Sequence, residues 1–171
     1  ASFGDPCPAH EVCNEELDRC EVITCGADQC FQAQAISGDG LYCFDNTAAT
    51  TDGPNHAFCP YFPPGSEARD LWYCWQAPAT GETRVETCGF TNIDSTLAVY
   101  AGCACPTAAT PLIRCSDDSC GLQTIVDFGV VKGQSYLIRL SSFPNSPGGS
   151  GLLSIETDAV CGAGAGECCF A

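Results

Sequence analysis

Basic residues are scarce in this sequence. Its 171 residues include six Lys or Arg against 21 Asp or Glu, and the formal net charge is -15. A nucleic-acid partner requires a cationic footprint for its phosphates, and anionic lipid headgroups attract basic segments in the same way. The charge balance therefore argues against binding to nucleic acid and against docking on anionic membranes.

Long apolar runs are missing too. No apolar run approaches the roughly 20 residues that a membrane helix needs, so we expect no membrane insertion. Methionine is absent, whereas glycine (18 residues) and proline (11 residues) are frequent. This composition, in which good helix formers rarely cluster, favours an all-β protein.

Recognisable catalytic constellations are absent as well. The two histidines are His10, within an acidic segment, and His56, within a loop pattern. The sequence contains no Gly-x-Ser-x-Gly elbow and no cysteine in a recognisable Cys/His protease context. Acidic residues are plentiful, but nothing marks any pair as the acid and base of a glycosidase. We therefore predict that the protein is not an enzyme.

Cysteine, in contrast, is abundant, with 16 residues. A cytosolic thiol pool would keep so many thiols reduced, so the count predicts disulfides and a secreted, extracellular or cell-surface protein. The expected disulfide cysteines are Cys7, Cys13, Cys20, Cys25, Cys30, Cys43, Cys59, Cys74, Cys88, Cys103, Cys105, Cys115, Cys120, Cys161, Cys168 and Cys169.

The cysteines divide unevenly along the chain. Residues 1–30 hold five, the segment from Cys43 to Cys120 holds eight, and the C-terminal tail holds three. If all of them pair, each terminal segment must form at least one bond outside itself. The simplest closure joins the N-terminal segment to the tail, within one molecule or between two. Bonds from the terminal segments to the central segment are excluded only if the eight central cysteines pair among themselves.

Composition also divides the chain into three parts. Residues 1–30 are an acidic, cysteine-rich extension with too few apolar residues to fold alone. Residues 31–157 carry the recurring strand patterns of a β-sandwich domain, and residues 158–171 are a Gly- and Cys-rich tail. We expect disulfides, the domain itself or a neighbouring molecule to hold the extension.

Short strand patterns follow one another through the central part. Within residues 134–142, Tyr136, Ile138 and Leu140 share one face and Arg139 points to the other. We expect these three apolar side chains in the core, together with Val85 and Val99. The number and spacing of the strands predict a disulfide-rich, jelly-roll-like antiparallel β-sandwich. The expected strands span residues 41–44, 70–77, 83–87, 95–100, 112–115, 122–131, 134–142 and 151–157.

Several ordered motifs also carry a resemblance. They are DLWYCWQAPATGETRVETCG, DSTLAVYAGCACP, IRCSDDSCG and VKGQSYLIRLSSF. Together they resemble the jelly-roll β-sandwich domains of bacterial secreted proteins, and they are similar in pattern to pre-peptidase C-terminal domains. The resemblance covers roughly residues 41–157 and implies a non-catalytic accessory or surface module. The cysteine-bearing extensions depart from the pattern of an ordinary appended domain.

Two residue sets are candidates for metal binding. Asp94, Asp117 and Asp118 lie in turns between strands and offer the hard oxygen ligands that calcium accepts in irregular geometry, although Asp is also an ordinary turn residue. The second set, Cys103, Cys105, Cys115 and Cys120, has the count of a zinc site but not its knuckle spacing. Disulfides are favoured for it, with Cys103 and Cys105 each bonding to the Cys115/Cys120 segment.

Sugars could contact this chain in two ways. Trp72, Tyr73 and Trp75 could stack on sugar rings, but alternation along a strand points Trp72 away from the other two. Core packing is therefore the favoured role of these aromatic residues. The sequence contains no Asn-x-Ser/Thr site, whereas residues 47–51 and 107–111 could carry O-linked glycans.

These observations lead to one functional prediction and one alternative. We predict a non-enzymatic extracellular structural protein, whose subunits self-assemble through their terminal extensions into a helical filament, a fibril or a surface layer. The partner is then another copy of the chain. The alternative is a monomeric extracellular module that binds carbohydrate or calcium.

Overall fold

The chain folds into a sandwich of two β-sheets. The computed structural model describes residues 24–55, 59, 65 and 67–160, together with the backbone of residues 11–14 and 19–22. The described residues contain no α-helix, and a single turn of 3-10 helix, η1 (Cys30–Gln32), precedes the first strand of the sandwich. None of the described residues belongs to a helix long and apolar enough to cross a membrane.

The larger sheet has five strands in the order β3-β5-β10-β7-β8. All of its pairings are antiparallel except the one between β3 and β5, which is parallel. The five strands are β3 (Gln34–Ser37), β5 (Ala68–Gln76), β10 (Ser135–Ser142), β7 (Ser95–Ala101) and β8 (Arg114–Asp117).

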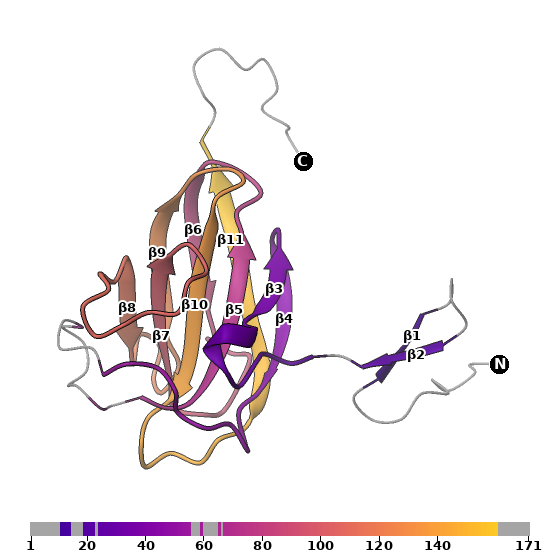
Figure 1. Ribbon diagram of the computed structural model, residues 1–171, viewed down its shortest axis with the longest axis vertical. Helices are drawn as coiled ribbons and strands as arrows, with labels where there is room; N and C mark the ends of the chain where they lie inside the picture. Colours follow the sequence, from indigo (N-terminus) through magenta and orange to yellow (C-terminus); the bar gives the residue numbers. More distant parts are fainter. Residues whose placement is uncertain are drawn as a thin grey trace.

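The smaller sheet is entirely antiparallel, in the order β4-β11-β6-β9. The two sheets pack face to face (Figure 1), which confirms the predicted all-β, jelly-roll-like sandwich. The four strands are β4 (Gly40–Asp45), β11 (Ser150–Ala159), β6 (Gly81–Glu86) and β9 (Ile125–Val130).

Most predicted strands are present, and two are displaced. The strand expected over 122–131 begins at Ile125, because the preceding residues form a turn around Cys120. The strand expected over 112–115 starts at Arg114 and runs to Asp117. The tight turn at Lys132–Gly133 is also present, and Gly133 takes a φ of 77° that favours glycine.

The core between the sheets follows the alternation seen in the sequence. Each of the five predicted core residues is buried, which confirms the predicted register: Tyr136, Ile138, Leu140, Val85 and Val99. Trp75 and Tyr73 point into the same core from β5, and their neighbour Trp72 points to the opposite face.

The outer face of the five-stranded sheet is buried as well. Trp72, Tyr100 and Leu137 form a second apolar cluster there, together with Cys30 and Cys59 from the loops that cover the sheet. Trp72 and Trp75 are both 0% exposed, so neither ring is available for stacking on a sugar. This agrees with the core-packing role predicted for the aromatic residues.

Five disulfides join the described residues, and their pattern corrects the predicted pairing. Cys103 and Cys105 do not bond to the Cys115/Cys120 segment. Cys103 lies just after β7, and its disulfide to Cys74 of β5 spans the covered face of the sheet. The bond therefore links the two strands that lie on either side of β10. The five bonds are Cys25–Cys43, Cys30–Cys105, Cys59–Cys115, Cys74–Cys103 and Cys88–Cys120.

The N-terminal segment bonds to the central part of the chain. Cys25 pairs with Cys43 and Cys30 pairs with Cys105, so two cysteines of the extension form the bonds to the central segment that the sequence left open. The reason is that residues 24–28 pack along the sandwich, where the Asp45 N–H donates to the Cys25 carbonyl. The predicted closure of the extension onto the tail stays a prediction, because Cys7, Cys161, Cys168, Cys169 and the side chains of Cys13 and Cys20 lie outside the described part of the chain.

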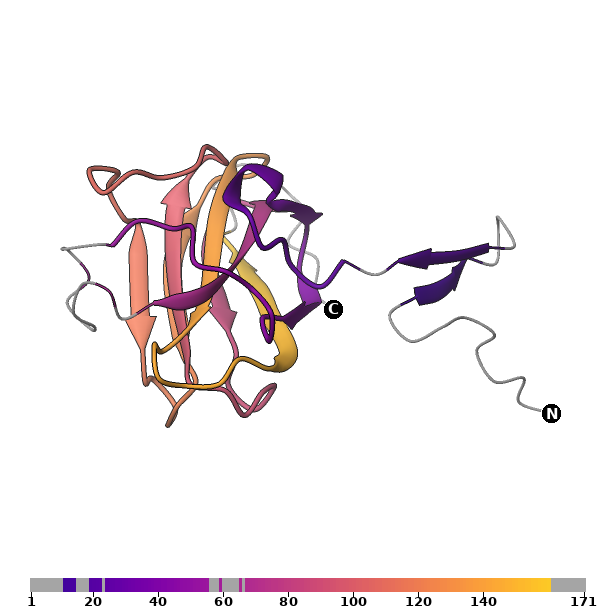
Figure 2. The same ribbon diagram turned by 60° about the horizontal axis from the view of Figure 1, so that its bottom comes forward.

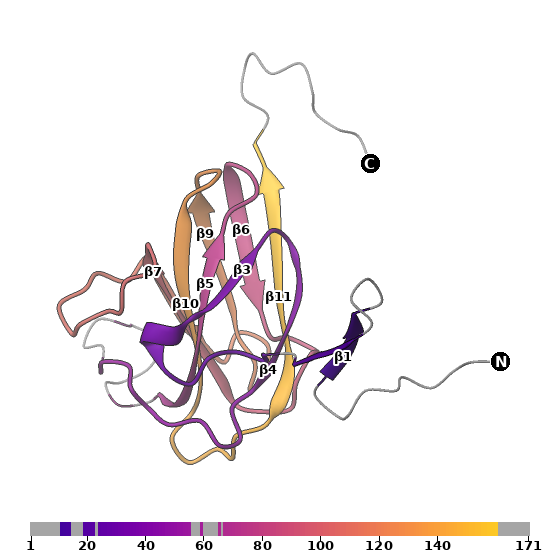
Figure 3. The same ribbon diagram turned by 45° about the vertical axis from the view of Figure 1, so that its right-hand side comes forward.

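A small hairpin precedes the sandwich. Strands β1 (Glu11–Asn14) and β2 (Arg19–Val22) pair antiparallel, with Cys13 opposite Cys20 in the register. This hairpin forms a separate two-stranded sheet. It lies beyond the edge of the sandwich, on the side of β4 (Figures 1 and 3).

Candidate functional site

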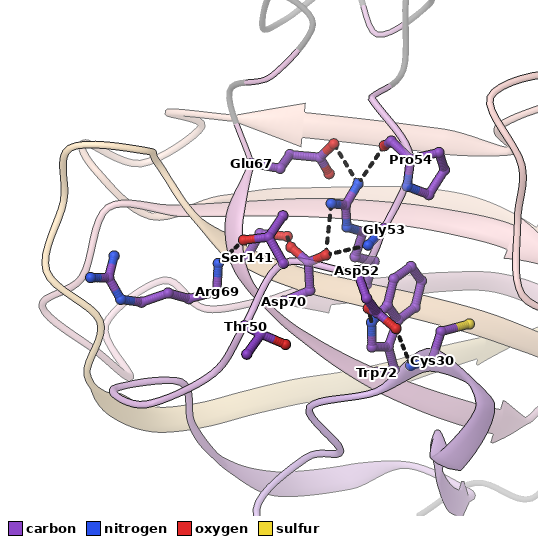
Figure 4. A network of polar contacts seen from close by, with 12 residues as sticks. Cys30, Thr50, Asp52, Gly53, Pro54, Glu67, Arg69, Asp70, Trp72 and Ser141 are labelled. Atoms are coloured by element: carbon purple, nitrogen blue, oxygen red, sulfur yellow. Dashed lines mark hydrogen bonds and ion pairs between the residues drawn. The ribbon is translucent and has the colours of Figure 1, made fainter.

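Two groups of charged side chains could carry chemistry, and the first is a buried ion network (Figure 4). Arg139 is fully buried because alternation along β10 turns it away from the core and under the covering loops. Its Nη1 atom lies 2.6 Å from Oε2 of Glu67, and its Nη2 atom lies 2.8 Å from Oδ2 of Asp70. The guanidinium also stands over the ring of Trp72, 5.4 Å from the centroid.

The two acids of this network have unequal surroundings. Asp70 accepts hydrogen bonds from Arg139, from the Ser141 hydroxyl and from the Gly53 N–H. Glu67 has a second oxygen, Oε1, that is buried without a hydrogen-bond partner among the described residues. Burial raises the pKa of Glu67 to about 7, against the lowering effect of Arg139.

The network is closed to substrates. The Pro54 carbonyl accepts a hydrogen bond from Arg139, and the Trp72 indole N–H donates to Asp52, so the loop lies directly over the charged groups. Gly53 is required for this approach, because a Cβ at that position would lie 2.3 Å from the Cζ atom of Arg139. The arrangement therefore holds the covering loop on the sheet and presents no reactive group to solvent.

The second group is the predicted acidic cluster. Asp94, Asp117 and Asp118 each place a carboxylate oxygen within 4.8 Å of the others. Asp94 lies just before β7 and Asp117 at the end of β8, and the pairing of these neighbouring strands brings the two acids together. Asp118 follows in a left-handed conformation with a φ of 54°. The three residues singled out in the sequence are thus neighbours in space.

Burial, together with neighbouring charge, raises the pKa of two of these acids. Burial raises the pKa of Asp117 to about 6, and the charges of Asp118 and Asp94 act in the same direction. Burial followed by the charge of Asp118 also raises the pKa of Asp94. The Oδ1 atom of Asp117 is buried, and nothing in the described part of the chain hydrogen-bonds to it. A bound cation would offset the repulsion among the three carboxylates and would give the Oδ1 atom of Asp117 a partner.

Calcium suits such a cluster better than a transition metal. Calcium takes six to eight oxygen ligands in flexible geometry, and the cluster offers three carboxylates. Carbonyl groups and water would complete the coordination. Zinc, by contrast, prefers cysteine and histidine, and the four cysteines considered for it are all in disulfides.

The remaining candidate residues show no common site. Threonines of both proposed O-glycan stretches are exposed, but Thr50 and Thr51 already hydrogen-bond through their hydroxyl groups. His10 and His56 lie outside the described residues. The buried network was not predicted, although the placement of Arg139 opposite a core face was the one signal that pointed to it.

Comparison with known sequences adds no functional assignment. No protein-family model matches the chain, and a search of curated proteins gives no match. The resemblance to bacterial jelly-roll domains therefore stays a prediction. The five disulfides fit an oxidising environment, and the function has to be argued from the geometry.

Proposed function

We propose that the protein is a secreted structural subunit that assembles with copies of itself, through an N-terminal arm, into a filament, fibril or layer. The arm is defined as residues 1–22. The observation that carries the proposal is the β1–β2 hairpin, which pairs with no other described strand. A two-stranded hairpin alone is marginally stable in water, so the arm needs a surface to pack on.

The root of the arm supports the same function. Cys25 is bonded to Cys43 on β4, and Cys30 is bonded to Cys105 beyond β7. Two covalent bonds thus fix the segment from which the arm departs. An arm with a fixed origin reaches a neighbour in a defined direction, and a head-to-tail contact that does not close into a ring propagates into a helical fibre.

Deleting the arm tests this proposal. A deletion of residues 1–22 keeps every described disulfide, whereas a cut after residue 30 would leave Cys43 and Cys105 without their partners. We expect the shortened protein to keep its β-type circular dichroism and its melting temperature. It should elute as a monomer and show no long assemblies by electron microscopy. Intact protein that never assembles, or shortened protein that assembles as before, would contradict the proposal.

A second candidate function is calcium binding by the Asp94–Asp117–Asp118 cluster, and the observation that favours it is the convergence of the three carboxylates. We expect calcium at a hundredfold excess over its Kd to stabilise the fold by about 2.7 kcal/mol. Chelation should reverse the effect, and Asp117→Ala should abolish it.

Asp158→Ala is the matched control for the calcium experiment. It removes one exposed carboxylate from β11, away from the cluster. This variant should keep the calcium-dependent rise in melting temperature. Identical melting curves for wild-type protein with calcium and with chelator would reject the site.

A further inference from the structure

The sandwich has an open seam between two edge strands. β8 ends the five-stranded sheet, β9 ends the four-stranded sheet, and the two strands are neighbours without pairing. A groove of about 300 Å³ lies along this seam, which we define by four lining residues: Arg84, Arg114, Ile125 and Asp127.

The β9 side of the seam offers unpaired backbone groups. The Thr87 N–H donates to the Thr124 carbonyl, so hydrogen-bonded pairs between β6 and β9 fall at alternate positions from there. This register turns the N–H and C=O groups of Asp127 and Gly129 away from β6. No other strand in the described part of the chain pairs with them. An edge of this kind accepts an added strand.

Charge distinguishes the seam from the rest of the molecule. It holds two of the six basic residues in a chain of charge -15. Arg84 is paired with Asp127 at 2.8 Å, while Arg114 is exposed and has no ion pair among the described residues. The arm has the opposite character: residues 1–22 contain six acids and one Arg, so 1 − 6 gives a side-chain charge of -5. Its acids are Asp5, Glu11, Glu15, Glu16, Asp18 and Glu21.

The arm and the seam lie on opposite sides of the sandwich. The root of the arm is bonded to β4, which is one edge of the four-stranded sheet, and β9 is the other edge. In Figures 1 and 2 the hairpin and β8 stand at opposite ends of the view. If the seam of each subunit receives the arm of the next, the same contact repeats in one direction and produces an open chain of subunits.

We infer that the seam between β8 and β9 is the docking site for the β1–β2 hairpin of a second copy, which adds a strand to the free edge of β9 beside Arg114. This inference rests on the proposed function and names the receiving surface. The partner is recognised by backbone pairing along Asp127–Gly129 and by attraction between Arg114 and the acidic arm.

Two substitutions in the full chain test the backbone contact. Gly129→Pro removes an N–H that points away from β6, and a side chain is tolerated there because a Cβ would meet no atom within 4 Å. We expect Gly129→Pro to abolish long assemblies, as measured by light scattering and electron microscopy. The control, Gly129→Ala, keeps the N–H and should assemble like wild type.

A second pair of variants tests the charge contact without altering the backbone. Arg114→Glu should raise the concentration needed for assembly by roughly tenfold or more. Lys132→Glu makes the same change of charge at an exposed turn outside the groove and should have little effect. If circular dichroism shows that Gly129→Pro is misfolded, the comparison of Arg114→Glu with Lys132→Glu decides.

The outcomes separate this inference from the function on which it rests. If both seam variants assemble like wild type while the arm deletion does not, the arm docks elsewhere and the seam inference is wrong. If the seam variants fail but the arm deletion still assembles, another segment occupies the seam, and both proposals fall. Loss of assembly in the arm deletion, Gly129→Pro and Arg114→Glu, with both controls intact, supports the inference.

Discussion

Arg139→Met is expected to lower the free energy of unfolding by about 3–5 kcal/mol, because it leaves two buried carboxylates without a cation. Arg139, Glu67 and Asp70 are all buried, and the two ion pairs measure 2.6 and 2.8 Å. The methionine side chain can fill much of the volume over Trp72 but cannot neutralise either acid. Urea unfolding under non-reducing conditions measures the loss.

Two further variants separate charge from packing at this position. Glu67→Gln in the Arg139→Met background removes one of the uncompensated charges, so it should restore part of the lost stability. Arg84→Met makes the same substitution at an exposed ion pair and should leave the unfolding midpoint almost unchanged. Equal losses at Arg139 and Arg84 would contradict the network as a determinant of stability.

Ile138→Ala is expected to cost about 2–5 kcal/mol through lost burial and the cavity left behind. Ile138 is 0% exposed and lies at the centre of the five-stranded sheet, between Tyr73 of β5 and Val99 of β7. Its close surroundings are large side chains on paired strands, which cannot collapse far into the vacated space. The unfolding midpoint in urea, at an unchanged m-value, checks this prediction.

The control for Ile138→Ala is Ile113→Ala. Ile113 is 38% exposed and precedes β8, so the same substitution there removes less buried surface than at the fully buried Ile138. A neutral result at Ile138 would contradict the register of β10, whereas a comparable loss at Ile113 would show that the effect is not specific to the core.

Much of the fold could be predicted because it depends on local alternation. The face shared by Tyr136, Ile138 and Leu140 follows from a period of two residues and is the face buried between the sheets. The acidic cluster could be predicted for a related reason. Asp94 and Asp117 lie in turns that flank the expected strands 95–100 and 112–115, and such turns meet wherever their strands are neighbours.

The disulfide pattern could not be derived in the same way. Cys103 and Cys115 lie on adjacent strand ends, which suggested a bond between nearby loops, but their true partners are Cys74 and Cys59. The choice depends on how long loops cross the outer face of the five-stranded sheet, and no local pattern encodes that path. Glu67 escaped prediction for the same reason, since its role arises only when the chain closes over Arg139.

The bond between Cys25 and Cys43 has a mechanical consequence. Tension pulling on the arm reaches Cys25 first and passes through the bond directly into β4. Without this bond, the pull would draw out the chain from Cys25 to the next crosslink at Cys30, which is about 17 Å of slack. Because the bond takes the load at Cys25, η1 and β3 lie off the load path and cannot be peeled from the sheet by the pull. A string of subunits joined through their arms would thus transmit force from one sandwich to the next without lengthening at this point.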